Sequence, residues 1–303
     1  MKCVKCNRKA VFLRPSYCKT HFLAYIEKKV MDTIKRYRLL EKTGKVIVAA
    51  SGGKDSISCA YILKKLGYNI EVLAIDEGIA GYRNHTISDL RRFCKEKKIK
   101  LNIIDIGKTM GRGLDSLVKE SGLGACTLCG AIRRYAINRW AKKLGACVVA
   151  TGHNLDDEVQ AIMMNFLRNN LAFSARIGPV TGLKNNQGFI RRVKPLYLCT
   201  EKEIAAYAFL RSFRIGYNIC PYTNTSYRYH IQELLNDIEK KIPNTKKNII
   251  NNFLSILPIL KKRYETKEGA NICKSCGEPC SKSVCRVCSI LAKNLNKPSV
   301  SAY

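Results

Sequence analysis

The residues best suited to chemistry stand in one short segment, Ser51-Gly52-Gly53-Lys54-Asp55-Ser56. It follows a β-branched run at 45–50 and precedes a helical pattern at 57–66. Two glycines allow a tight turn with outward-facing N–H groups, and the next helix would present its N-terminus there. Lys54 adds a positive charge and the two serines add hydroxyl groups. The segment therefore predicts a phosphate-binding loop, although its spacing is neither Walker A nor Gly-x-Gly-x-x-Gly.

Two groups of cysteines, one at each end of the chain, have the spacing of metal ligands. Each group holds two ligand pairs with two residues between the members of a pair, which is typical of a structural zinc module. The first set is Cys3, Cys6, Cys18 and His21, and the second is Cys273, Cys276, Cys285 and Cys288. Cys280 lies between the later pairs and could compete as a ligand. Four ligands close a zinc site, so we expect both to be structural.

A third group of cysteines has an incomplete ligand set. Cys126 and Cys129 precede a helical pattern at 131–144, and Cys220 stands alone far downstream. Three converging thiols would leave one position open on a metal ion or iron–sulfur cluster. Alternatively, they form a nucleophile and a resolving pair for persulfide or disulfide chemistry, or they are structural. The remaining cysteines, in apolar contexts, are expected in the core: Cys59, Cys94, Cys147 and Cys199.

Short apolar runs alternate with helical patterns through the middle of the chain. The runs cover 45–50, 70–75, 100–106 and 146–151, and the helices between them cover 57–66, 83–97 and 131–144. This alternation predicts an α/β fold with a doubly wound parallel sheet, flanked here by the two zinc modules. In such sheets ligands bind beyond the C-terminal strand ends, which is where the glycine-containing segment falls.

Composition points to a polyanionic partner. Of 303 residues, 54 are Lys or Arg and 23 are Asp or Glu, a net charge of +31. Such a chain repels itself unless it meets a polyanion, nucleic acid first and an anionic membrane surface second. Lysine- and asparagine-rich stretches such as 246–253 could instead reflect a proteome-wide bias in composition. No apolar run is long enough to span a membrane and no signal peptide is evident, so we expect a cytoplasmic protein with reduced cysteines.

Three motifs in fixed order resemble those of a known superfamily. The segment at 51–56 resembles the pyrophosphate loop of N-type ATP pyrophosphatases, and Thr151-Gly152-His153-Asn154-Leu155-Asp156-Asp157 resembles their second nucleotide-site motif. Lys194-Pro195-Leu196, followed by Glu201-Lys202-Glu203-Ile204, resembles a third. With the three cysteine groups added, the chain resembles the TtuA-like tRNA 2-thiouridine synthetases, a PP-loop family, from residue 3 to residue 288.

The resemblance implies an ATP- and Mg²⁺-dependent enzyme that adenylates O2 of a tRNA uridine and lets sulfur displace AMP. It implies ATP binding by Ser51, Gly52, Gly53, Lys54, Asp55, Ser56, Ile75, Arg133, Gly152 and Asp157. It implies catalytic roles for Cys126, Cys129, Cys220, Asp55, Asp156 and Asp157. The three cysteines would bind a [4Fe–4S] cluster whose open iron holds sulfur, although related thiolases use a cysteine persulfide. It also implies a homodimer and a sulfur donor, either a ubiquitin-like protein thiocarboxylate or inorganic sulfide.

The resemblance also suggests a division of the chain. We expect a zinc knuckle at 1–25, the catalytic domain at 26–224, a helical tRNA-binding extension at 225–268 and a zinc ribbon with a tail at 269–303. Basic stretches at 138–143, 190–194 and 240–263 could contact RNA, and tyrosines near the extension could stack a flipped base. Two alternatives are a PP-loop enzyme that modifies cytidine and a non-enzymatic zinc protein that binds RNA.

Overall fold

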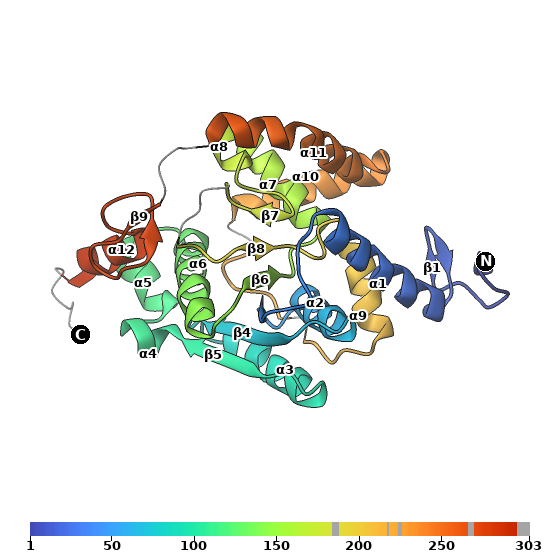
Figure 1. The fold of residues 1–303 in the computed structure, drawn as a ribbon, viewed down its shortest axis with the longest axis horizontal. Helices are drawn as coiled ribbons and strands as arrows, with labels where there is room; N and C mark the ends of the chain where they lie inside the picture. The colour runs from blue at the N-terminus through green and yellow to red at the C-terminus, as the bar shows by residue number, and fades with distance from the viewer. Residues whose placement is uncertain (184–187, 217, 224–225, 266–269, 296–303) are drawn as a thin grey trace.

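A six-stranded sheet lies at the centre of the computed structural model, which describes residues 1–303 except 184–187, 217, 224–225, 266–269 and 296–303. Its strand order is β5-β4-β3-β6-β8-β7, and all neighbours are parallel except the edge pair β7–β8 (Figure 1). The strands are β3 (Val46–Ala49), β4 (Ile70–Asp76), β5 (Leu101–Asp105), β6 (Val148–Thr151), β7 (Val180–Thr181) and β8 (Arg192–Val193).

Helices connect and cover these strands. Those before β6 are α1 (Lys19–Arg36), α2 (Lys54–Lys65), α3 (Arg83–Glu96), α4 (Ile106–Met110), α5 (Leu114–Ser121) and α6 (Ala125–Lys143). Those after it are α7 (Leu155–Leu167), α8 (Leu171–Ser174), α9 (Glu201–Leu210), α10 (Tyr227–Lys241), α11 (Thr245–Tyr264) and α12 (Arg286–Leu295). Within the described residues, no helix is both long and apolar enough to cross a membrane.

Successive residues of the central strands enter different hydrophobic cores. Val46 and Val48 of β3 pack with α1, α2, α3 and α9, whereas Ile47 between them packs with α5, α6 and α12. This alternation follows from the two-residue period of a strand. Because both faces of a mostly parallel sheet are covered, the predicted doubly wound α/β fold is confirmed.

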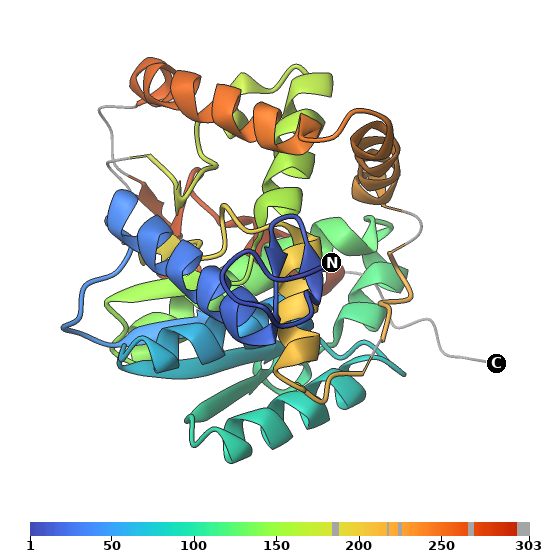
Figure 2. The same cartoon turned by 90° about the vertical axis from the view of Figure 1, so that its right-hand side faces the viewer.

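Two helices near the C-terminal end build a third core beside the sheet. Ile231 of α10 and Phe253 of α11 are buried together with Val159 of α7. Figure 1 and Figure 2 place α10 and α11 on the same side of the sheet as α7 and α8. Helices α10 and α11 fall within the segment 225–268 that is predicted as a helical extension. Both pack against α7, the helix whose start carries the second nucleotide-site motif.

The two cysteine-rich modules lie at opposite ends of the molecule's longest dimension (Figure 1). The first contains the hairpin β1 (Phe12–Leu13) with β2 (Ser16–Tyr17) and runs directly into α1. The second contains the hairpin β9 (Asn271–Ile272) with β10 (Pro279–Cys280), followed by α12. Each module has only short strands, as expected where ligand residues replace a core.

Two helices begin earlier than their apolar patterns indicate. Helix α2 begins at Lys54 instead of residue 57, and α6 begins at Ala125 instead of residue 131. The first turns of these helices are rich in polar residues, glycine and cysteine. A search for apolar residues at helical spacing therefore misses them. As a result, Cys126 and Cys129 lie within a helix. Cys147, expected in the core, is exposed, while Cys59, Cys94 and Cys199 are buried as expected.

Candidate functional site

The segment at 51–56 forms the turn between β3 and α2. Gly52 has φ +93°, and a Cβ on it would stand 2.3 Å from the backbone oxygen of Thr86, so a side chain is excluded. Gly53 is the N-cap of α2, and no side chain caps that helix. The first N–H groups of the helix therefore remain available to a phosphate, with the helix dipole favouring its charge.

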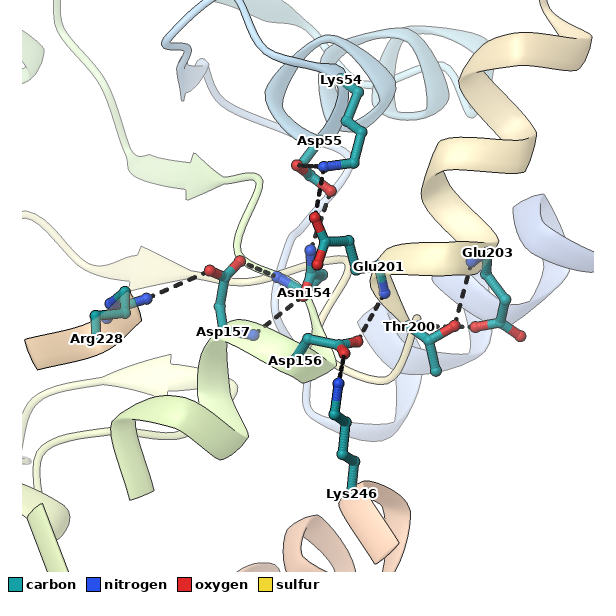
Figure 3. A network of polar contacts seen from close by, with 10 residues as sticks. All are labelled: Lys54, Asp55, Asn154, Asp156, Asp157, Thr200, Glu201, Glu203, Arg228 and Lys246. Atoms are coloured by element: carbon teal, nitrogen blue, oxygen red, sulfur yellow. Dashed lines mark hydrogen bonds and ion pairs between the residues drawn. The ribbon is translucent and has the colours of Figure 1, made fainter. Parts of the chain in front are cut away.

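The loop at the end of β6 packs against this turn. A Cβ on Gly152 would stand 2.7 Å from both the Cα and the backbone nitrogen of Ser56. Asn154 Nδ2 donates a hydrogen bond of 3.0 Å to Asp55 Oδ1 (Figure 3). Asn154 also forms a capping box with Asp157 at the start of α7. These contacts fix the two predicted nucleotide motifs against each other at neighbouring strand ends.

The Lys54 side chain lies among carboxylates. Its Nζ atom is 2.8 Å from Glu201 Oε1 and 3.2 Å from Asp55 Oδ2 (Figure 3). Although partial burial opposes its charge, these carboxylates raise the pKa of Lys54 to about 12. Lys54 is therefore cationic at neutral pH and stands beside the open start of α2, where it could pair with a phosphate.

The adjacent aspartates have different surroundings. Asp156 is 7% exposed; its Oδ1 is 2.6 Å from Lys246 Nζ of α11, and its Oδ2 accepts a 2.7 Å hydrogen bond from the Glu201 backbone. Asp157 is half-buried, and its Oδ1 is 3.3 Å from Nη1 of Arg228, an exposed residue on α10. Burial raises the pKa of Asp157 and also that of Asp55. Asp156 is thus fully engaged in joining α7, α9 and α11, whereas Asp157 stays accessible.

A buried arginine supports the turn from behind. Arg83 is 2% exposed; it donates a 2.7 Å hydrogen bond to the Ser51 backbone oxygen and another to that of Ile75. Its Nε lies 2.7 Å from Glu77 Oε2, and the other oxygen of Glu77 lies 3.1 Å from Arg133 Nε. The side chain of Ile75 is buried in the core. Arg133 therefore points to Glu77, and the backbone oxygen of Ile75 accepts a hydrogen bond from Arg83.

The three cysteines of the incomplete set lie in one region at the start of α6, but unlike the terminal sets their Sγ atoms do not all lie within 4.8 Å of one another. Cys126 and Cys129 lie one turn apart, and Cys126 Sγ donates to the Tyr222 backbone oxygen at 3.7 Å, next to Cys220. Burial and the charge of Cys220 raise the pKa of Cys126. Burial and the charge of Glu77 raise the pKa of Cys129 to about 11. Cys126 and Cys129 are therefore mostly protonated thiols in the free protein, and a bound metal would remove their protons.

Both terminal ligand sets converge. The ligand atoms of Cys3, Cys6, Cys18 and His21, and separately those of Cys273, Cys276, Cys285 and Cys288, lie within 4.8 Å of one another. The Cys285 N–H donates to Cys273 Sγ at 3.1 Å, and this bond with nearby amides lowers the pKa of Cys273 to about 6. Cys280 is not in the converging set; its Sγ donates to the Lys282 backbone oxygen. Each set has the donors and closeness that a tetrahedral Zn²⁺ needs.

Comparison with known proteins identifies the family to which this chain belongs. A PP-loop domain model matches residues 23–241. A tRNA-5-methyluridine(54) 2-sulfurtransferase of Pyrococcus horikoshii is 38% identical, covering 98% of this chain and 96% of its own. The chain belongs to the TtuA-like family of PP-loop tRNA 2-thiolation enzymes. The resemblance read from the sequence motifs is thereby confirmed.

Other members of this TtuA-like family match the whole length of the chain. Cytoplasmic tRNA 2-thiolation protein 1 of Xenopus laevis is 34% identical, covering 98% of this chain and 89% of its own. A solved U34-tRNA thiolase of Methanococcus maripaludis, described with its [4Fe–4S] cluster, has a TM-score of 0.81. It is 32% identical and covers 100% of this chain and 99% of its own. The enzyme class and the fold are therefore shared across the full chain.

Four residues at this site have no individual role in the sequence-based prediction: Glu77, Arg83, Asn154 and Glu201. Glu201 and Asn154 were noted only as parts of motifs, although the former pairs with Lys54 and the latter joins both nucleotide segments. A detectable sign existed for Asn154, because an N-cap residue followed three positions later by an acidic residue is typical of a helix start. Arg83 and Glu77 gave no such sign, since their role depends on burial.

Proposed function

We propose that this protein is an ATP-dependent tRNA sulfurtransferase that replaces O2 of a uridine with sulfur. The observation that carries the proposal is the position of Arg228 between two sites. Its guanidinium is 3.3 Å from Asp157 at the nucleotide loop. Burial raises the pKa of Cys126, and the charge of Arg228 opposes that rise, which places Arg228 within electrostatic reach of this thiol. A nucleotide on the loop and a sulfur at the cysteines would thus meet over one substrate base.

The first step is adenylation. The N–H groups at the start of α2 and the Lys54 ammonium hold the β- and γ-phosphates, and Asp55 with Asp157 supplies carboxylate oxygens for Mg²⁺. The uracil O2 attacks the α-phosphorus, the bond from that phosphorus to the bridging oxygen breaks, and pyrophosphate leaves. The uracil oxygen thereby becomes part of a good leaving group.

The second step is sulfur transfer. A [4Fe–4S] cluster bound by Cys126, Cys129 and Cys220 would leave one iron open for the incoming sulfur. Sulfur adds at C2, the C2–O bond breaks, and AMP leaves with the former uracil oxygen. A protein thiocarboxylate and inorganic sulfide both deliver sulfur at the sulfide level, so either donor needs no added reductant.

The terminal ligand sets, the substrate tRNA and the oligomeric state belong to the same proposal. Two Zn²⁺ ions would close the terminal ligand sets and hold those modules folded. The protein would act in the cytoplasm as a homodimer, with tRNA seated on the helical extension. The relatives named for positions 54 and 34 give two target uridines, which nuclease mapping of the thiolated tRNA distinguishes.

Adenylation can be tested apart from sulfur transfer. The anaerobically purified protein is incubated with Mg²⁺-ATP, labelled pyrophosphate and tRNA, without a sulfur donor. We expect exchange of label into ATP that depends on tRNA and disappears in Lys54→Ala. The exposed neighbour of Glu201 gives a matched control, Lys202→Ala, which should exchange normally. Exchange that persists in Lys54→Ala would contradict the role of the loop.

A further inference from the structure

Three arginines from separate elements gather beside the cysteine end of α6. They are Arg134 on α6, Arg192 on β8 and Arg286 on α12. Partial burial and the charge of Arg286 lower the pKa of Arg134, and burial and the charge of Arg134 lower that of Arg192. Arg134 is therefore within electrostatic reach of both Arg286 and Arg192. The packing agrees, because Val287, next to Arg286, shares a core with Ile132 of α6.

None of the three has a carboxylate partner in the part of the chain that the structure describes. Other arginines of the site do: Arg83 and Arg133 share Glu77, and Arg228 pairs with Asp157. Close, unpaired cations destabilise a fold by mutual repulsion unless an anion binds between them.

A single buried asparagine holds the three elements together. Asn138 lies one turn after Arg134 on α6 and is 9% exposed. Its Oδ1 accepts a 2.9 Å hydrogen bond from the backbone of Ile190, two residues before Arg192. Its Nδ2 donates a 2.8 Å hydrogen bond to Glu278 of the C-terminal module that carries Arg286. The convergence of the arginines is thus built into the fold.

The cluster borders the reaction centre. The Nη1 atom of Arg134 lies 3.2 Å from the point where a Cβ would stand on Gly130, the residue after Cys129. Arg286 stands between two ligand residues, Cys285 and Cys288, so a metal ion at that set would fix its backbone. Arg134 and Arg286 are exposed and Arg192 is half-buried, which leaves the cluster accessible.

We propose that Arg134, Arg192 and Arg286 form a phosphate site that holds the RNA backbone next to the target uridine. The inference rests on the proposed function and adds the substrate contact that positions the nucleotide. A planar guanidinium group can bind two oxygens of one phosphate. Such contacts position the RNA on the protein without recognising its base sequence. The C-terminal module thereby supplies part of the substrate site.

Salt dependence of tRNA binding tests the site. The zinc- and iron-loaded protein is titrated with tRNA over a range of KCl concentrations, as wild type and as Arg134→Ala, Arg192→Ala and Arg286→Ala. Each change should weaken binding roughly tenfold and lower the slope of log K against log salt by about 0.7 to 0.9. Arg286→Lys should keep most of the salt dependence and lose part of the affinity for tRNA. Lysine retains the positive charge but lacks the planar guanidinium that binds two phosphate oxygens at once.

Two controls test whether the loss of affinity belongs to these three arginines. Lys282→Ala removes an exposed cation from the same module outside the cluster and should change the slope least. ATP affinity should stay at the wild-type value in the arginine variants. Unchanged slopes, an equal loss in Lys282→Ala, or a loss of ATP affinity instead of tRNA affinity would overturn the proposal. Failure of the wild-type protein to bind tRNA would refute the proposed function itself, and this site with it.

Discussion

The Cα atom of Ser56 lies 2.7 Å from the point where a Cβ would stand on Gly152. The end of β6 therefore touches the first turn of α2 through bare backbone. This contact holds the phosphate loop and the Asn154–Asp157 segment in one arrangement, and it is the reason that the second motif needs a glycine at that position.

Gly152→Ala should separate these segments and reduce ATP-dependent activity. A shift of about 1 Å in a positioned group can cost roughly a hundredfold in rate. Gly124→Ala is the matched control, because a Cβ there meets nothing within 4 Å and the residue has an ordinary φ of −58°. Equal ATP affinity and equal pyrophosphate exchange in both variants would contradict the steric account.

Glu201→Gln should leave the fold intact and weaken the contact of Lys54 with its nearest carboxylate oxygen, Glu201 Oε1 at 2.8 Å. The ammonium group would then pair with phosphate without first losing a carboxylate, so the ATP concentration at half-maximal exchange should fall severalfold. Titration of pyrophosphate exchange with ATP measures this. A marked rise would instead place Glu201 among the groups that bind Mg²⁺-ATP.

Substitutions at Asp156 and Asp157 should have different effects, one mainly on stability and the other mainly on adenylation. Asp156→Asn leaves Lys246 buried without a counter-charge, which should lower the free energy of unfolding by about 3 to 5 kcal/mol. Adding Lys246→Met should restore much of that loss. Asp157→Asn should change stability little and reduce adenylation strongly. Denaturant unfolding with pyrophosphate exchange checks both, and the reverse pattern would contradict these assignments.

The sequence predicted the phosphate loop because Gly52, Gly53 and Lys54 stand directly after a buried strand, a purely local pattern. It could not separate Asp156 from Asp157, because the difference comes from Lys246 and Arg228 on distant helices. The sequence also could not predict the partners of Arg83 or the proximity of Arg134 to Arg192, because both depend on how α6 packs against the sheet. The loop is a local feature of the sequence, whereas the different surroundings of the two aspartates depend on tertiary contacts.

Cys220→Ser should remove iron and leave zinc. Cys220 belongs to the set at α6, while the two zinc ligand sets lie at the ends of the molecule (Figure 1). Anaerobic preparations should contain about two zinc and four iron atoms per chain, with only the zinc retained in the variant. Cys147→Ser, at an exposed cysteine outside all three sets, is the control. Two zinc and no iron in the wild-type protein would contradict the cluster assignment.

The most direct test of the central claim is a complete reaction with the anaerobically purified, metal-loaded protein. Unmodified tRNA, Mg²⁺-ATP and sulfide are supplied, and the digested nucleosides are identified by mass spectrometry. We predict a 2-thiolated uridine formed in equal amount to AMP, and none without ATP or in Lys54→Ala. A protein with intact iron and zinc that binds tRNA and ATP but forms no thiolated uridine would contradict the account.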